Sequence, residues 1–70
     1  MLRDTVASSN IASIGYDPAT ETLEIEFTNS SIYQYYNVPS SLNEQLMMAS
    51  SKGQFFHIYI RNAYPFSRVG

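Results

Sequence analysis

Three tyrosines in the middle of the sequence could stack on the bases of an unpaired nucleic acid. Tyr33, Tyr35 and Tyr36 lie in one β-prone run, and aromatic rings on a sheet hold bases in this way, with roughly 1 to 3 kcal/mol per stacked base. In the alternative interpretation, Tyr33 and Tyr35 pack against the helices as core and leave Gln34 exposed. The residue types do not decide which side of the run is buried, because Ile32 and Tyr36 would also accept burial.

A short segment of serines, lysine and glycine suggests a second kind of chemistry. Ser50, Ser51, Lys52 and Gly53 precede a predicted helix, and hydroxyls, an ammonium and free backbone N–H groups at such a point together suit a phosphate. The segment lacks the glycines of a Walker loop. An ordinary serine cap with a glycine between two helices explains the same residues without a ligand.

Basic residues concentrate near the C-terminus. Residues 51–70 carry three of them and no acid, although the whole chain has a net charge of −2 and a pI near 5.0. This overall charge argues against a non-specific polyanion binder, because such binding depends on accumulated Lys and Arg. Lys52, Arg61 and Arg68, with Tyr64 beside them, could nevertheless form a small nucleic-acid-binding patch. Solvated surface side chains are the alternative.

The remaining residues do not assemble a catalytic or metal site. The chain has no cysteine and one histidine, His57, which excludes disulfides, thiolate metal sites and a cysteine nucleophile. Glu24 and Glu26 share one side of a strand, and simple polar–apolar alternation explains them without catalysis. We therefore expect a non-enzymatic protein that needs no cofactor and binds no metal.

A sheet is expected to position the tyrosines. Residues 22–28 alternate, with apolar side chains at 23, 25 and 27, which predicts a half-buried strand whose polar side needs no cover. Residues 10–16 are β-prone and end at the turn signal Asp17-Pro18, and residues 32–36 favour a third strand. Short turns between the three strands predict an antiparallel meander.

Two helices are expected to follow the sheet. Ser41 and Glu44 form a capping-box signature for a helix over residues 41–50. Apolar residues at positions i, i+1, i+4 and i+5 predict a second helix over residues 53–61, although residues 55–60 also have the composition of a strand. The predicted fold is α+β, a three-stranded antiparallel β-meander followed by two short helices packed on one face (β-β-β-α-α).

The chain is expected to form one small domain over residues 1–70. Residues 1–8 show no periodicity and are a loose lead-in or part of the first strand. The N-terminus lacks the pattern of a signal peptide, and the longest apolar stretch, Leu46 to Ala49, is far too short to cross a bilayer. We therefore expect a soluble, cytoplasmic protein that does not enter a membrane.

Several short motifs follow one another along the chain: Ser8-Ser9-Asn10-Ile11, Ile14-Gly15-Tyr16-Asp17, Tyr33-Gln34-Tyr35, Val38-Pro39, Ser51-Lys52-Gly53, Phe55-Phe56, Ile60-Arg61 and Tyr64-Pro65. Their order and spacing resemble the KTSC domain, a module found at the C-terminus of some bacterial lysyl-tRNA synthetases and as a small free-standing bacterial protein. The resemblance implies no catalytic residue, and RNA binding is suggested for the family by its attachment to a tRNA-charging enzyme.

Two functions from different classes are therefore expected. The first is a binding module for RNA, either tRNA or a single strand, which uses the C-terminal basic residues and one or more tyrosines. The second is a protein-interaction or self-associating domain, such as a homodimer, favoured by the low charge, the many aromatic residues and the unprotected edges of the first and third predicted strands.

Overall fold

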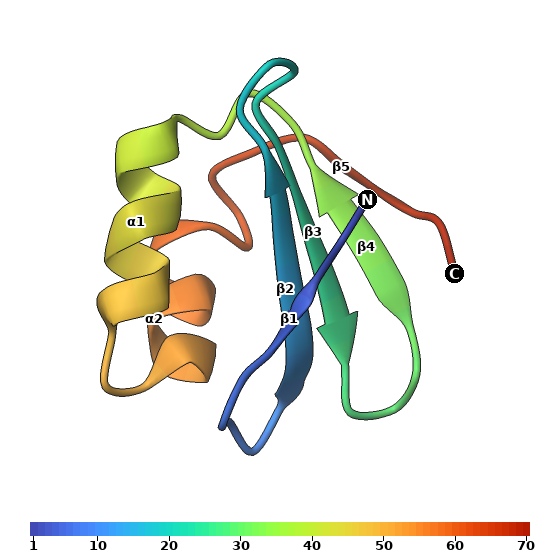
Figure 1. The fold of residues 1–70 in the computed structure, drawn as a ribbon, viewed down its shortest axis with the longest axis vertical. Coiled ribbons are helices and arrows are strands. Elements are labelled where there is room, and N and C mark those ends of the chain that lie inside the picture. The colour runs from blue at the N-terminus through green and yellow to red at the C-terminus, as the bar shows by residue number, and fades with distance from the viewer.

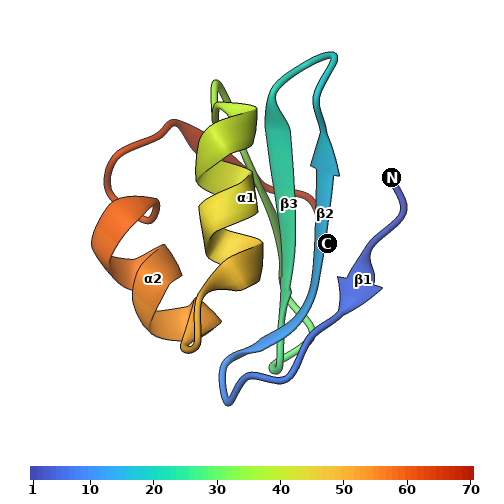
Figure 2. The same ribbon diagram turned by 60° about the vertical axis from the view of Figure 1, so that its left-hand side comes forward.

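The computed structural model describes residues 1–70 as two layers, one sheet and one pair of helices (Figure 1). The sheet has five antiparallel strands in the order β1-β2-β3-β4-β5, and both helices lie in sequence between β4 and β5. The helices cover one face of the sheet, and the N-terminal segment lies on the opposite side (Figure 2). The elements are β1 (Asp4–Thr5), β2 (Ile11–Asp17), β3 (Thr22–Phe27), β4 (Ile32–Tyr35), α1 (Ser40–Met48), α2 (Lys52–Tyr59) and β5 (Phe66–Arg68).

The three predicted strands and the two predicted helices are confirmed, but the sheet also has two short edge strands. In the first, Asp4 pairs with Ile14 of β2, and in the second, Phe66 pairs with Tyr35 of β4. Both edges that we expected to be unprotected are therefore covered. The alternative of a strand over residues 55–60 is wrong, because the helical spacing of its apolar residues turns one stripe of α2 onto the sheet.

A β-bulge in β2 lets two residues of opposite parity enter the core. The pairing of β2 with β3 shifts between Ile11 and Ser13, so β2 has one extra residue there. Ile11 and Ile14 are three positions apart and would face opposite sides of a regular strand. With the bulge, both are buried, at 1% and 2% exposed.

The two helices begin differently. Pro39 is the N-cap of α1 and supplies no capping hydrogen bond, so the capping box predicted at Ser41 is wrong. Because the helix starts at Ser40, Ser41 lies inside the first turn, where its hydroxyl is past the N-cap position. In α2, the Gln54 backbone N–H donates to the Ser51 hydroxyl at 3.3 Å, as expected of a serine cap.

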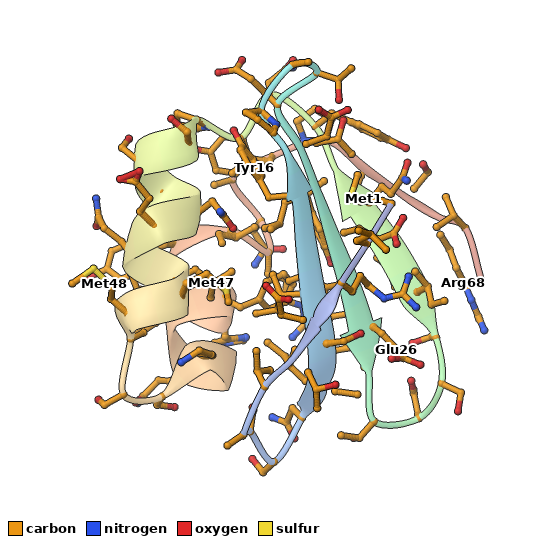
Figure 3. All side chains as sticks on the ribbon, in the orientation of Figure 1. Met1, Tyr16, Glu26, Met47, Met48 and Arg68 are labelled. Carbon is orange, nitrogen blue, oxygen red and sulfur yellow. The ribbon has the colours of Figure 1, made fainter.

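The core lies between the helices and the inner face of the sheet. Tyr33 and Tyr35 both belong to this inner face, where Tyr35 is buried and Tyr33 half-buried. In α1, Met47 points toward the sheet and Met48 away from it (Figure 3). The buried apolar residues are Ile11, Ile14, Leu23, Ile25, Tyr35, Val38, Leu46, Phe56 and Ile60.

The outer face of the sheet is polar, yet the N-terminal segment covers part of it. Arg3 forms an ion pair with Glu24 and donates from Nε to the Ser13 hydroxyl at 2.9 Å. Gln34 donates from Nε2 to Glu24 Oε1 at 2.8 Å. Glu24 is only 7% exposed and Gln34 is half-buried, so the expectations that the polar side of the strand needs no cover and that Gln34 is exposed are both wrong.

Gly15 makes room for this cover. A Cβ atom at Gly15 would lie 2.5 Å from the Leu2 carbonyl oxygen and 2.9 Å from Arg3 Cγ. Neither distance leaves space for a side chain, so the glycine allows the N-terminal backbone to lie against β2. This close approach brings the Arg3 guanidinium to Glu24.

The charge of Glu24 is stabilised in this setting. Burial by itself raises the pKa of Glu24, but the hydrogen bonds from Gln34 and Arg3, together with the charge of Arg3, outweigh burial. The pKa of Glu24 therefore lies below its ordinary value, and the carboxylate stays ionised at neutral pH.

Candidate functional site

A cleft of about 610 Å³ opens between α2 and the inner face of the sheet. Aromatic rings form much of its lining. The ring centroid of Tyr35 lies 5.1 Å from that of Phe56 and 5.7 Å from that of Phe66, and the rings of Tyr33 and Tyr35 are inclined by only 26°. Asn10, His57, Arg61 and Asn62 are among the polar residues that line the same cleft.

Three of the lining residues come from one side of α2 and from the turn that follows it. Gly53 and His57 are four apart, so they lie above one another along the same side of α2. Arg61 lies in the turn that follows the end of the helix at Tyr59. Phe56 and Ile60, one position earlier, are buried against the sheet. The cleft therefore borders the polar side of α2, and the adjacent side of the same helix is buried in the core.

Arg61 and His57 contact each other at this border. Their nearest polar atoms, Arg61 NH1 and His57 Nδ1, are 3.3 Å apart, and both residues are exposed. A guanidinium can only donate, so Nδ1 is the acceptor in this contact. Arg61 keeps further N–H groups free to bind an anion.

Tyr35 also lines the cleft. It is 4% exposed, and its hydroxyl makes no hydrogen bond within the protein. That oxygen still reaches solvent, because Asn43 Oδ1 is the one buried side-chain polar atom without a partner. Burial raises the pKa of Tyr35, as does the neighbouring Tyr33, while the charge of Arg61 offsets part of the rise. The hydroxyl therefore keeps its proton at neutral pH and is available to donate to a ligand.

A second, polar hollow of about 520 Å³ lies at the start of α2. Ser50, Ser51, Lys52 and Gly53 line one side of it, and residues 7–10 line the other. Several of its polar groups are engaged. The Ser51 hydroxyl caps α2, the Ser8 hydroxyl accepts from the Ile11 backbone N–H at 3.3 Å, and Lys52 Nζ donates to the carbonyl oxygen of Ala49 at 3.1 Å. The ammonium keeps two further hydrogens.

The sequence-predicted site residues thus fall into four places. Tyr33, Tyr35 and Arg61 share the aromatic cleft with Gly53, which lines both hollows. Arg68 lines neither hollow; it lies at the far edge of the sheet (Figure 3), where its Nε donates to the Gly70 carbonyl oxygen at 2.8 Å. The remaining residues are Tyr64, which packs half-buried against the core, and Ser50, Ser51 and Lys52, which line the polar hollow.

Sequence reasoning missed several residues of the cleft. In the sequence, Phe56 belongs to the apolar stripe of a predicted helix and His57 is the single histidine of the chain, so neither residue type points to a cleft. The spacing of His57 and Arg61 is the one signal that could have joined them, because residues four apart share a helix face. Asn10 and Asn62 carry no such signal, since only the tertiary structure brings their loops to the cleft.

No group of three or more His, Asp or Glu side chains lies close enough together to hold a metal ion. Neither helix has the length and apolar character that crossing a membrane requires.

Comparison with protein families shows which family the chain belongs to. Residues 7–64 match the family model of the KTSC domain. The chain belongs to the KTSC family. The resemblance seen in the motifs is thereby confirmed.

The KTSC domain has relatives of two lengths. It is 39% identical over 70 residues to an uncharacterized protein of Stutzerimonas stutzeri, covering 99% of each chain. The crystal structure of a KTSC domain protein from Yersinia pestis is similar at a TM-score of 0.96 and 42% identity, covering 99% of this chain and 97% of that one. A lysine–tRNA ligase of a Nostoc species is 37% identical over 75 residues, and this chain spans only 13% of the ligase.

Proposed function

We propose that this KTSC domain binds unpaired RNA by stacking a base in the aromatic cleft and pairing a phosphate with Arg61. The cleft is the observation that supports this function. Its volume of about 610 Å³ lies within the roughly 300 to 1,000 Å³ of small-ligand sites. Aromatic rings beside a guanidinium are the combination that stacks on bases and holds their phosphates.

The cleft favours an unpaired strand over a duplex. Bases in an RNA helix are stacked and paired, so their faces cannot reach rings that lie inside a cleft. Tyr35 supplies one hydroxyl donor to the cleft, and Asn10 and Asn62 supply amides. These groups can hydrogen-bond the edges of a base whose face rests on the rings.

The RNA to test first is tRNA. A relative that carries this module is a lysine–tRNA ligase, whose name makes tRNA its substrate. Transfer RNA offers unpaired bases in its loops and at its end. We infer that the module supplies RNA contacts of this kind both within the ligase and as a separate chain.

Binding is expected to be weak and sensitive to salt, because few cationic groups lie near the cleft. Each phosphate neutralised on a single strand contributes about 0.7 to the slope of log K against log salt. With Arg61 at the cleft and Lys52 at the polar hollow, the slope should not exceed about 1.4.

The test is an NMR titration of the ¹⁵N-labelled chain with total tRNA and with short oligonucleotides at low salt. We expect shift changes at the cleft, and loss of binding in Arg61→Gln and Phe66→Ala. Met48→Ala is the matched control, because Met48 is another exposed apolar side chain, 85% exposed, on the outside of α1. The proposal fails if no RNA shifts the resonances of the cleft.

A second candidate function is a surface for another protein or a second copy of the chain. Met48, Ile58 and Tyr59 are large apolar side chains that are 85%, 61% and 54% exposed on the two helices, and such exposure can mark an interaction surface. The molecular mass measured in solution over a range of concentrations tests self-association. A dimer that Ile58→Glu dissociates supports this function, and a monomer at every concentration contradicts the self-association form of it.

A further inference from the structure

The strand β5 covers the edge of β4 but is itself the outermost strand on that side of the sheet. Its backbone bonds to β4 at every second residue, as at the Val69 N–H, which donates to the Ile32 carbonyl oxygen at 2.8 Å. In an antiparallel ladder, the residues between those that bond turn their N–H and C=O groups the other way. Phe66 and Arg68 therefore present four backbone groups to the outside of the sheet.

We infer that β5 pairs antiparallel with β5 of a second copy of this chain, so that the two sheets become one across a two-fold axis at Ser67. This inference goes beyond the proposed function and does not depend on RNA binding. With the axis at Ser67, Phe66 of each copy lies opposite Arg68 of the other. These are the two residues whose backbone groups face outward, so each pair exchanges two hydrogen bonds and the interface contains four.

The side chains of this register are complementary as well. Phe66 is paired with Tyr35 and Arg68 with Tyr33 in the ladder between β4 and β5, so all four side chains face the inner side of the sheet. The Cβ atoms of directly opposite residues are about 4.5 to 5.5 Å apart. Each guanidinium therefore reaches the Phe66 ring of the other copy, and a cation within about 6 Å of a ring centroid is attracted to the face of the ring.

Both partners of this contact are accessible in the single chain. Phe66 is 57% exposed. The Nε of Arg68 donates to the Gly70 carbonyl oxygen of its own chain, which leaves four N–H groups of the guanidinium. Proline, bulges and charges are among the features that keep edge strands from pairing. The strand β5 has no proline, bulge or acid, and its one charge is the arginine that this register places against a ring.

Ser67 suits the position on the axis. The two copies of Ser67 form a pair without hydrogen bonds between their backbones, and in such pairs the opposite side chains come closest. The serine side chain is small, and its hydroxyl is hydrogen-bonded to that of Tyr36 in the same chain. It therefore leaves room for the same residue of the second copy.

Sedimentation over about 10 µM to 1 mM protein measures the pairing. Arg68→Gln removes the charge alone, and Arg68→Pro also removes an outward N–H. Proline is tolerated in an edge strand where the N–H faces solvent, so the ladder to β4 is kept. Thr5→Pro is the matched control. It removes an outward N–H from the opposite edge strand, β1, where the adjacent Val6 N–H donates to the Ala12 carbonyl oxygen at 3.2 Å.

We expect a dimer with a dissociation constant between about 10 µM and 1 mM, because the interface is small. Arg68→Gln should raise this constant about 5- to 30-fold through loss of two ring contacts, Arg68→Pro should raise it at least as much, and Thr5→Pro should change it less than about twofold. In a mixture of labelled and unlabelled chains, NMR should show intermolecular contacts between the Phe66 ring and the Arg68 side chain. Thermal unfolding shows that each variant is folded, and Arg68→Gln serves if Arg68→Pro is not.

Three results would overturn the inference. A monomer throughout this range of concentration would mean that β5 does not pair. A dimer that Ile58→Glu dissociates and the Arg68 variants do not would place the interface on the helices. A dimer without contacts between Phe66 and Arg68 of different copies would have another register. None of these results bears on base stacking in the aromatic cleft, which the titration with RNA tests separately.

Discussion

The buried ion pair on the outer face gives the sharpest prediction about stability. Glu24→Gln keeps the shape of the side chain but replaces one carboxylate oxygen with an amide nitrogen. Glu24 receives hydrogen bonds from both Gln34 and Arg3, so the new NH₂ group must face a donor. The side chains of Glu24 and Arg3 are 9% and 25% exposed, so water reaches the arginine but hardly reaches the carboxylate.

The expected cost follows from these contacts. Hydrogen bonds to charged groups contribute about 1.5 to 3 kcal/mol each, and removing one partner of a fully buried ion pair costs about 3 to 5 kcal/mol. Because Arg3 can recover some hydration, we expect a loss of about 2 kcal/mol. For a domain of this size that corresponds to a fall in Tm of about 8 to 16 °C.

Thermal and urea unfolding followed by circular dichroism at pH 7 measures this loss. Arg3→Met and the double variant complete a cycle, in which the double variant should lose less stability than the two single variants together. A Tm of Glu24→Gln within about 2 °C of the wild-type value would refute the role assigned to the pair.

The same variant has a defined pH dependence. The pKa of Glu24 is lowered in the folded state from its ordinary value of 4.5, so its ionisation stabilises the fold above that value. This contribution is lost as the pH falls through the folded-state pKa. The stability difference between the wild-type chain and Glu24→Gln should therefore be constant near neutral pH and shrink below pH 4.5; a difference that grows in acid would contradict this.

Three further substitutions test the packing. Gly15→Ala places a Cβ against the Leu2 backbone, so we expect a loss of about 1 to 3 kcal/mol and faster hydrogen exchange in β1; unchanged exchange there would contradict the close approach. Ser51→Ala removes the cap of α2 and should cost about 0.5 to 2 kcal/mol in urea unfolding, whereas an unchanged midpoint would show that the cap contributes nothing. Leu46→Ala empties a fully buried position and should cost about 2 to 5 kcal/mol by the same assay, and a loss below 1 kcal/mol would mean that the helices repack around the gap.

The candidate site was only partly predictable. Tyr33, Tyr35 and Arg61 were identified as separate groups from their residue types, and the structure places them around one cleft. Arg68 and Tyr64 were grouped with them because they are near in sequence, yet they line neither hollow. Residues that are near in sequence are not near in space here. The chain turns into β5 after α2, and β5 runs along the edge of the sheet farthest from β1.

The sequence by itself determined the elements whose signal is local. Alternation at residues 22–27 defines β3, the Asp17-Pro18 turn ends β2, and helical spacing defines α2. These patterns arise because apolar and polar residues face opposite sides of their own strand or helix. They recur at the period of that element, so a single segment is enough to show them.

Only the tertiary structure decided the edge strands, the burial of Glu24 and the aromatic cleft. β1 and β5 are too short to show a period and exist because a neighbouring strand pairs with them. Glu24 has the pattern of an exposed residue and is buried because the distant N-terminal segment lies over it. The cleft forms where the loop before β2 and the inner face of the sheet meet α2, more than forty residues from that loop in sequence, and such contacts between distant segments leave no local pattern.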